Sequence, residues 1–348
     1  MNDMQQVDSD LVELVDRFFR DRSDHGVVDA AESVDLDTSL WASVEELGLP
    51  LVGIDEEAGG SGGTLLDALT VNRVAALHAA PLPLAETYLA ASLLSGVGIQ
   101  VPEGPLAFAI PATGLAVTGD HAEGTLASVP WARAAVALAV VDAQANTVVF
   151  VPANSLTAGE GRDLAGQPSG PVTVSGPVTT ASVDASFVTS AVHRASLVRA
   201  AQIAGVLEAV SDITREYVSV REQFGRPVGT FQSVQQHVVT LAQMAAMTDL
   251  AVGQAVLSFG TPRESFEVAA TKLLANQNAA TAARSAHAAH GAIGVTREYR
   301  LQQFTRRLHT WRFVDGATRA LAVELGRILA AGPSFHGVIA DSREDQHA

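Results

Sequence analysis

Hydrophobic positions recur at three- and four-residue steps along two long stretches in the C-terminal half of the chain. The first stretch carries Leu197, Ala201, Ala204, Leu207, Val210, Ile213, Tyr217 and Val220, and the second carries Val234, Val238, Leu241, Met244 and Met247. This spacing places apolar side chains on one face of a helix. Gly225 and Pro227 lie between the stretches and are expected to end the first helix. The pattern therefore predicts a helical hairpin with a charged, aromatic turn at its tip.

The hydrophobic pattern changes twice along the rest of the chain. Residues 1–100 carry amphipathic helical segments, whereas residues 101–190 carry short, valine-rich runs separated by Gly, Pro, Asp or Asn, which are typical of strands. Helical periodicity then returns, with an alanine-rich helix over Glu264–His290 and a last helix over Ala317–Ala330. We expect an N-terminal α-helical domain (1–100), a middle β-barrel or sandwich domain (101–190), a C-terminal α-helical bundle (191–332) and a polar tail (333–348).

Composition narrows the class of protein. The 348 residues carry a formal net charge of −16, which argues against binding to nucleic acid or to an anionic membrane surface. Cysteine is absent, so the sequence offers no disulfide, no thiolate metal site and no cysteine nucleophile. We see no apolar core of a signal peptide at the N-terminus and no apolar run long enough to span a bilayer. We therefore expect a cytoplasmic protein that does not enter a membrane.

Three segments resemble one known family in the right order along the chain. The tip of the hairpin reads R-x-Q-F-G-x-P-x-x-x-F-Q-x-x-Q from Arg221, which resembles the signature of the acyl-CoA dehydrogenases. The segments HGAIGVTREYRLQQFTR from His290 and LGLPLVGIDEEAGGSG from Leu47 are similar to two further parts of that family. The resemblance implies an FAD enzyme with a β domain between two helical domains, the last of them a four-helix bundle.

The resemblance also assigns residues to the flavin, which in this family lies between subunits. It implies that Arg221 pairs with the pyrophosphate, a role that suits a forked cationic donor. Gln223 and Phe224 would line the same site, and Phe231 and Gln232 would touch the nucleotide end. For an isolated arginine, a surface ion pair with a neighbouring carboxylate is the alternative.

The second matching segment is less complete. His290 and Gly291 are present as in the family's flavin-binding segment, but Ala288 and Ala292 replace a glutamine and a glycine. The first change removes a side-chain donor, and the second adds a methyl group where the family backbone approaches its neighbours closely. His287 and His290 lie three residues apart without a carboxylate-bearing motif, so we expect no metal site.

The family's reaction needs a carboxylate base that removes the α-proton of an acyl-CoA thioester. At one location of that base the sequence has Asp315, one methylene shorter than the usual glutamate, and at the other it has Ala195. Asp315 is thus the candidate base, and the alternative is an N-cap for the helix that follows. The family's T-E-P-x-A-G-S-D stretch is missing from the β domain, and Trp131 does not match the context of the family's tryptophan-containing strand.

The retained features serve a flavin held by a neighbouring subunit, and the lost features serve a flavin held by this one. The resemblance is therefore closest to the smaller, base-lacking subunit of heteromeric actinobacterial acyl-CoA dehydrogenases of steroid or fatty-acid catabolism. We expect an α2β2 heterotetramer with a longer homologous subunit, FAD shared across the interface, and an acyl-CoA substrate. The alternatives are a self-sufficient homotetramer that uses Asp315 as its base, and a scaffold of this fold without chemistry.

Overall fold

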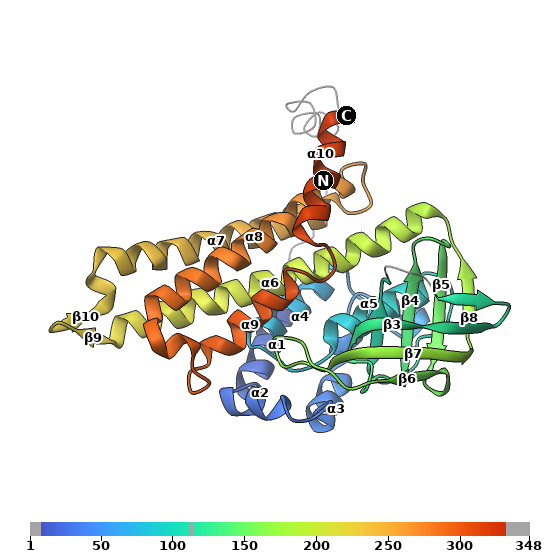
Figure 1. Cartoon of the computed structure of the whole chain (residues 1–348), viewed down its shortest axis with the longest axis horizontal. Helices are drawn as coiled ribbons and strands as arrows, with labels where there is room; N and C mark the ends of the chain where they lie inside the picture. Colours follow the sequence, from blue (N-terminus) through green and yellow to red (C-terminus); the bar gives the residue numbers. More distant parts are fainter. Residues whose placement is uncertain (1–7, 112–114, 332–348) are drawn as a thin grey trace.

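The computed structural model describes residues 8–111 and 115–331, and within them helices come first, then strands, then helices again (Figure 1). This order is the predicted one. The polar tail expected over 333–348 lies outside the described residues. None of the described helices combines the length and the hydropathy that a bilayer-spanning helix needs.

Four of the five helices of the N-terminal part have a polar N-cap residue. The carboxylates of Asp8, Asp24 and Asp37 accept backbone N–H groups at the first turns of α1, α2 and α3. Thr64 and Asp67 form a reciprocal capping box at the start of α4. The bounds are α1 Ser9–Arg22, α2 His25–Ala31, α3 Thr38–Glu46, α4 Leu65–Leu77 and α5 Leu84–Ser95.

The middle part consists of two four-stranded sheets. Their strands are β1 Leu106–Ala109, β2 Ala116–Thr118, β3 His121–Pro130, β4 Ala137–Asp142, β5 Thr147–Pro152, β6 Leu156–Ala158, β7 Ser169–Pro177 and β8 Thr179–Ser182. The orders are β1-β4-β5-β8 and β2-β3-β7-β6, with β1 parallel to β4 and every other pair antiparallel. Of the two predicted forms, the sandwich is the one found, because neither sheet closes into a barrel within the described strands.

Side-chain alternation along β4 explains how the layers stack. Leu138 and Val140 face the core shared by the two sheets, whereas Ala137, Ala139 and Val141 face the core that contains α5 and the helical bundle. Because both faces of β4 are covered, all six of its residues are buried, and the five before Asp142 read as a continuous apolar run in the sequence.

The C-terminal part is a bundle built on α6, whose 36 residues run from Ala185 to Val220. The helices α7 Gln232–Ser258 and α8 Glu264–His290 pack against it, followed by α9 Leu301–Trp311 and α10 Thr318–Ala331. The bounds of α8 are those predicted, whereas α10 begins one residue later than expected. Helix α6 already begins before residue 191, and the domain boundaries themselves stay predictions.

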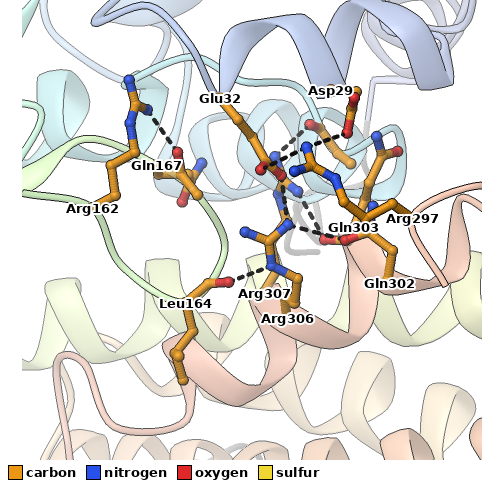
Figure 2. Close-up of polar contacts among 12 residues, drawn as sticks. Asp29, Glu32, Arg162, Leu164, Gln167, Arg297, Gln302, Gln303, Arg306 and Arg307 are labelled. Carbon is orange, nitrogen blue, oxygen red and sulfur yellow. Dashed lines mark hydrogen bonds and ion pairs between the residues drawn. The ribbon is translucent and has the colours of Figure 1, made fainter. Parts of the chain in front are cut away.

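Arginines of α9 and the loop before it join the three parts of the chain. Figure 2 shows Arg306 between the N-terminal part and the β6–β7 loop: its Nη1 donates to Glu32 Oε1 at 2.6 Å and its Nε donates to the carbonyl oxygen of Leu164. Arg297 donates to Asp29 Oδ1 at 3.0 Å. The buried Arg307 donates to the carbonyl oxygen of Ala79 at 2.8 Å. These contacts fix the position of the sandwich and of the N-terminal part relative to the bundle.

Candidate functional site

The hairpin tip between α6 and α7 is a tight β-turn. Helix α6 ends at Val220, and the short strands β9 Glu222–Gln223 and β10 Arg226–Pro227 pair antiparallel. Phe224 and Gly225 between them both have positive φ, 54° and 77°, as the two central residues of a type I′ turn require. Positive φ is strained for a phenylalanine, so the turn holds this aromatic ring at a sterically unfavourable position.

The flavin-assigned residues of the tip project away from the rest of the chain. Arg221, Gln223 and Gln232 are exposed, and their side chains form no hydrogen bond or ion pair with the described part of the chain. Phe224 is 90% exposed and meets the Phe231 ring edge-on at 6.0 Å. Among the described residues the Arg221 side chain has no carboxylate partner, and its predicted role at the flavin stays a prediction.

His290 and Gly291 lie at the same end of the bundle as the tip. The His290 ring stacks on Tyr217 at 4.4 Å, and the carbonyl oxygen of Tyr217 accepts the N–H of Arg221 at 2.9 Å. The His290 Nδ1 lies 2.9 Å from the carbonyl oxygen of Ala286, while its buried Nε2 has no partner among the described residues. Burial lowers the pKa of His290 below its ordinary value. The ring is therefore neutral with an unsatisfied acceptor, and Gly291 beside it has a φ of 66°.

Asp315 lies elsewhere, in the lining of a cavity of about 380 Å³ that residues of α5, the sandwich and the bundle enclose. Its carboxylate accepts hydrogen bonds from Arg199 Nε at 3.2 Å and Nη2 at 3.0 Å. The same Nη2 donates to Glu86 Oε1 at 3.1 Å, and Nη1 donates to Gln202 Oε1 at 2.7 Å. The Asp315 carboxylate is thus the counter-ion of an arginine, a different role from the helix cap that was the alternative to a base.

The backbone holds Asp315 in this position. Asp315 has a φ of 51°, which is uncommon outside glycine, and its carbonyl oxygen accepts from Ser196 Oγ at 2.7 Å. Gly316 follows with a φ of 121°, and its carbonyl oxygen accepts from Asn276 Nδ2 at 2.9 Å. Helices α6 and α8 therefore both fix the loop between α9 and α10.

Burial makes the charges of Glu86, Arg199 and Asp315 depend on one another. The side chains of Arg199, Glu86 and Asp315 are 4%, 6% and 13% exposed. Burial lowers the pKa of Arg199, but the charges of Asp315 and Glu86 outweigh burial and raise it above its ordinary value. Beneath the loop, burial lowers the pKa of Lys272 to about 7. The lining of the cavity thus contributes two carboxylates to one guanidinium.

Comparison with known proteins shows which sequences and folds the chain resembles. Residues 186–329 match the family model described as acyl-CoA dehydrogenase, C-terminal domain. Acyl-CoA dehydrogenase IpdE2 of Mycolicibacterium smegmatis is 28% identical over 275 residues, which cover 78% of this chain and 82% of that protein. The chain is therefore similar to the acyl-CoA dehydrogenase family over most of its length. Members of this family use FAD and act on acyl-CoA thioesters.

Two further proteins from Mycobacterium tuberculosis resemble the chain, one in sequence and one in fold. Acyl-CoA dehydrogenase FadE34 is 26% identical over 335 residues, which cover 87% of this chain but only 46% of that protein. The chain therefore spans about half the length of that relative. A chain of the ChsE4-ChsE5 complex shares the fold, with a TM-score of 0.85, 22% identity and coverage of 93% of this chain and 97% of that one.

The chain fits the two halves of FAD differently. The tip offers a cation and two amides that have no partner among the described residues, together with the exposed Phe224 ring, and His290 adds a buried unsatisfied atom nearby. The cavity instead has its arginine bound by Glu86, Gln202 and Asp315. Two carboxylates that share one guanidinium disfavour any ligand that develops negative charge there. The tip fits the pyrophosphate half, and the cavity does not fit the reacting half.

Sequence reasoning missed Glu86 and Arg199. A signal was present, because Arg199 is the only charged residue between Ala195 and Leu207, in a segment that otherwise reads as core. Glu86 similarly lies among the apolar residues of α5. A buried charge predicts a partner of opposite sign, but the sequence does not say which one.

Proposed function

We propose that the chain is the flavin-completing, non-catalytic subunit of a heteromeric acyl-CoA dehydrogenase that introduces an α,β double bond into an acyl-CoA thioester. The observation that carries the proposal is the hairpin tip. Arg221, Gln223 and Gln232 lie in a flavin-binding motif, are exposed and have no partner within the described residues. An arginine fork is suited to a pyrophosphate and reaches one that another chain presents.

The chain's own cavity supports the same proposal. The Asp315 carboxylate is hydrogen-bonded to Arg199 through two of the arginine's nitrogens, and Glu86 supplies a second negative charge to the same guanidinium. A general base must reach the proton that it removes and be free to accept it. Asp315 is held as a counter-ion, so the partner subunit supplies both the base and the site for the reacting ring of FAD.

The assembly that follows is an α2β2 heterotetramer, in which a longer homologous subunit binds the acyl-CoA substrate. The fold shared with a chain of the ChsE4-ChsE5 complex supports a partnership of two chains. The resemblance to heteromeric actinobacterial enzymes implies that the substrate is a fatty acyl or steroid CoA thioester in lipid or steroid catabolism.

The proposal is tested by producing the chain alone and together with a homologous acyl-CoA dehydrogenase subunit encoded near it. The chain alone should be colourless, and the complex should carry flavin and oxidise acyl-CoA. Loss of one charge-assisted hydrogen-bonding group typically weakens a ligand by roughly 10- to 100-fold. In the complex, Arg221→Ala should therefore lower flavin affinity by about that factor.

Arg215→Ala is the matched control, because Arg215 is an exposed arginine of the same helix that pairs with Asp212. This variant should retain flavin. Unchanged flavin affinity in Arg221→Ala would contradict the proposal, as would stoichiometric FAD and turnover in the isolated chain.

A self-sufficient homo-oligomer is the second candidate, and the position of Asp315 at the cavity favours it. It requires the isolated chain to bind FAD and to lose turnover on removal of the Asp315 carboxylate. A scaffold without chemistry would leave the chain free of flavin with every partner.

A further inference from the structure

The cavity that contains Asp315 is lined by two carboxylates that are only half paired. Arg199 directs its hydrogen bonds at one oxygen of each of them, Glu86 Oε1 and Asp315 Oδ2. The other oxygens, Glu86 Oε2 and Asp315 Oδ1, accept no hydrogen bond from the described part of the chain, although the Glu86 side chain is only 6% exposed. A buried carboxylate oxygen without a donor is costly, so these two oxygens predict a ligand that donates hydrogen bonds.

The remaining walls of the cavity suit the body of a small molecule. They are mainly apolar, with the buried side chains of Phe108 and Leu126 and the half-buried Val314 among them. Thr125 and Ala127 of β3 line the same cavity and are exposed, so the cavity opens to solvent along this strand. A volume of about 380 Å³ falls within the range of roughly 300–1,000 Å³ that is usual for small-ligand sites.

We propose that this cavity binds a small primary ammonium ion, with the ammonium head between the carboxylates of Glu86 and Asp315 and the hydrocarbon body along the apolar wall. The two carboxylates bond the same Arg199 Nη2, at 3.1 and 3.0 Å, so one head group reaches both. This inference goes beyond the proposed function, because it gives a ligand to the cavity that does not fit the reacting half of FAD.

The charges of the lining decide the class of ligand. Glu86, Arg199 and Asp315 are the charged side chains among the described lining residues, so one negative charge is in excess. That excess repels an anion, and a neutral alcohol leaves it uncompensated. A primary ammonium carries one positive charge and three N–H donors, enough to satisfy both carboxylate oxygens and leave one donor for the Thr125 hydroxyl or for solvent.

A buried lysine close to the carboxylates makes the expected binding depend on pH. Lys272 lies beneath the Asp315 loop, where its Nζ donates to Asn276 Oδ1 at 2.7 Å and to the carbonyl oxygen of Trp311 at 3.0 Å. Among the described residues, the charges that act on it are Asp315 in the loop and Arg199 of α6, and burial lowers its pKa to about 7. Below that pH a positive Lys272 competes for the charge of Asp315. Affinity for an ammonium ion should therefore rise as the pH is raised through about 7.

The test is isothermal titration calorimetry of the full chain with n-hexylammonium chloride, hexan-1-ol and sodium hexanoate, which share a hydrocarbon body and differ in the charge of the head. An alkylammonium has a pKa close to that of a lysine side chain, about 10.4, so it stays charged at neutral pH. Hexylammonium should bind once per chain and at least roughly 10-fold more tightly than hexanol, as expected for charge-assisted hydrogen bonds, and hexanoate should not bind. Equal affinities for the three compounds would overturn the inference.

Three variants locate the binding. Glu86→Gln removes one charge and keeps the shape of the side chain, so it should weaken hexylammonium by roughly 10- to 100-fold. Ala127→Leu fills the cavity without changing its charge and should abolish binding. Glu123→Gln is the matched control, because Glu123 is exposed on the same strand outside the lining and loses the same charge; it should bind like the wild type. This control separates the cavity from the general attraction of cations to a chain with a net charge of −16.

The remaining outcomes are equally decisive. Unchanged affinity in Ala127→Leu or in Glu86→Gln would overturn the inference; if Glu86→Gln does not fold, the three compounds and Ala127→Leu decide it. Lys272→Met should remove the rise in affinity through pH 7, and a rise that persists in this variant would contradict the role of Lys272. All titrations use the isolated chain, whereas the proposed function is judged by the flavin content of the complex, so either proposal can fail without the other.

Discussion

The role of Asp315 can be decided by Asp315→Asn, which removes the charge that accepts two hydrogen bonds from Arg199. Removing one partner of a buried ion pair typically costs about 3–5 kcal/mol. Glu86 remains as a second counter-ion at 3.1 Å, so we expect a loss of about 3 kcal/mol, the lower end of that range. With a melting entropy of about 2.1 cal/mol/K per residue, the 348 residues convert this loss into a fall in Tm of about 4 °C.

The assay measures Tm by thermal unfolding and turnover in the complex with the homologous subunit. If Asp315 is a counter-ion, Tm falls while kcat and flavin content stay the same. Loss of a general base lowers the rate by about 100- to 10,000-fold, so a fall of that size with an unchanged Tm would refute the reasoning. Asp212→Asn is the control, because it removes a carboxylate from an exposed ion pair and should change Tm by less than about 1 °C.

Three further substitutions test a buried charge and the packing of the bundle. The pKa of Lys272 is lowered to about 7 from 10.5, so between these values the unfolded chain binds more protons and stability rises with pH. Lys272→Met should therefore exceed the wild type in Tm by a margin that shrinks as the pH is raised from 7 toward 10.5, and a margin that does not change with pH would contradict this. Gly205→Ala should destabilise by about 1–3 kcal/mol in denaturant unfolding, because its Cβ would lie 2.0 Å from the carbonyl oxygen of Arg73. Gly326→Ala, in a helix with open space around it, should instead stabilise by about 0.5–1 kcal/mol, and equal effects of the two changes would refute the packing argument.

The spacing of hydrophobic residues predicted individual helices well, because the pattern of each helix is contained in its own stretch of sequence. The helix Glu264–His290 has the predicted bounds because a turn over residues 259–263 precedes it and Gly291, a glycine with positive φ, follows it. The sheets were harder to predict. Short valine-rich runs indicated strands, but nothing local distinguishes a barrel from a sandwich, because that depends on which distant strands pair.

The candidate site residues also fall into those that the sequence could reveal and those that only the folded structure reveals. Arg221 to Gln232 are contiguous in the sequence, so one motif revealed them together. Glu86, Arg199 and Asp315 are more than 100 positions apart from one another, and only the folded chain brings them within hydrogen-bonding distance. The sequence identified Asp315 by its place in the chain but could not show that Arg199 already binds it.

Helix α6 carries both Arg199 and, at its C-terminal end, Arg221, so a single continuous helix separates the cavity from the tip. At 1.5 Å per residue, the 22 steps between these residues correspond to about 33 Å along the axis. The helix has no proline that would bend it, so this separation is a fixed length rather than an adjustable one. Substitutions at Arg221 and at Asp315 should therefore act independently within one chain, and any coupling between them would have to pass through another subunit.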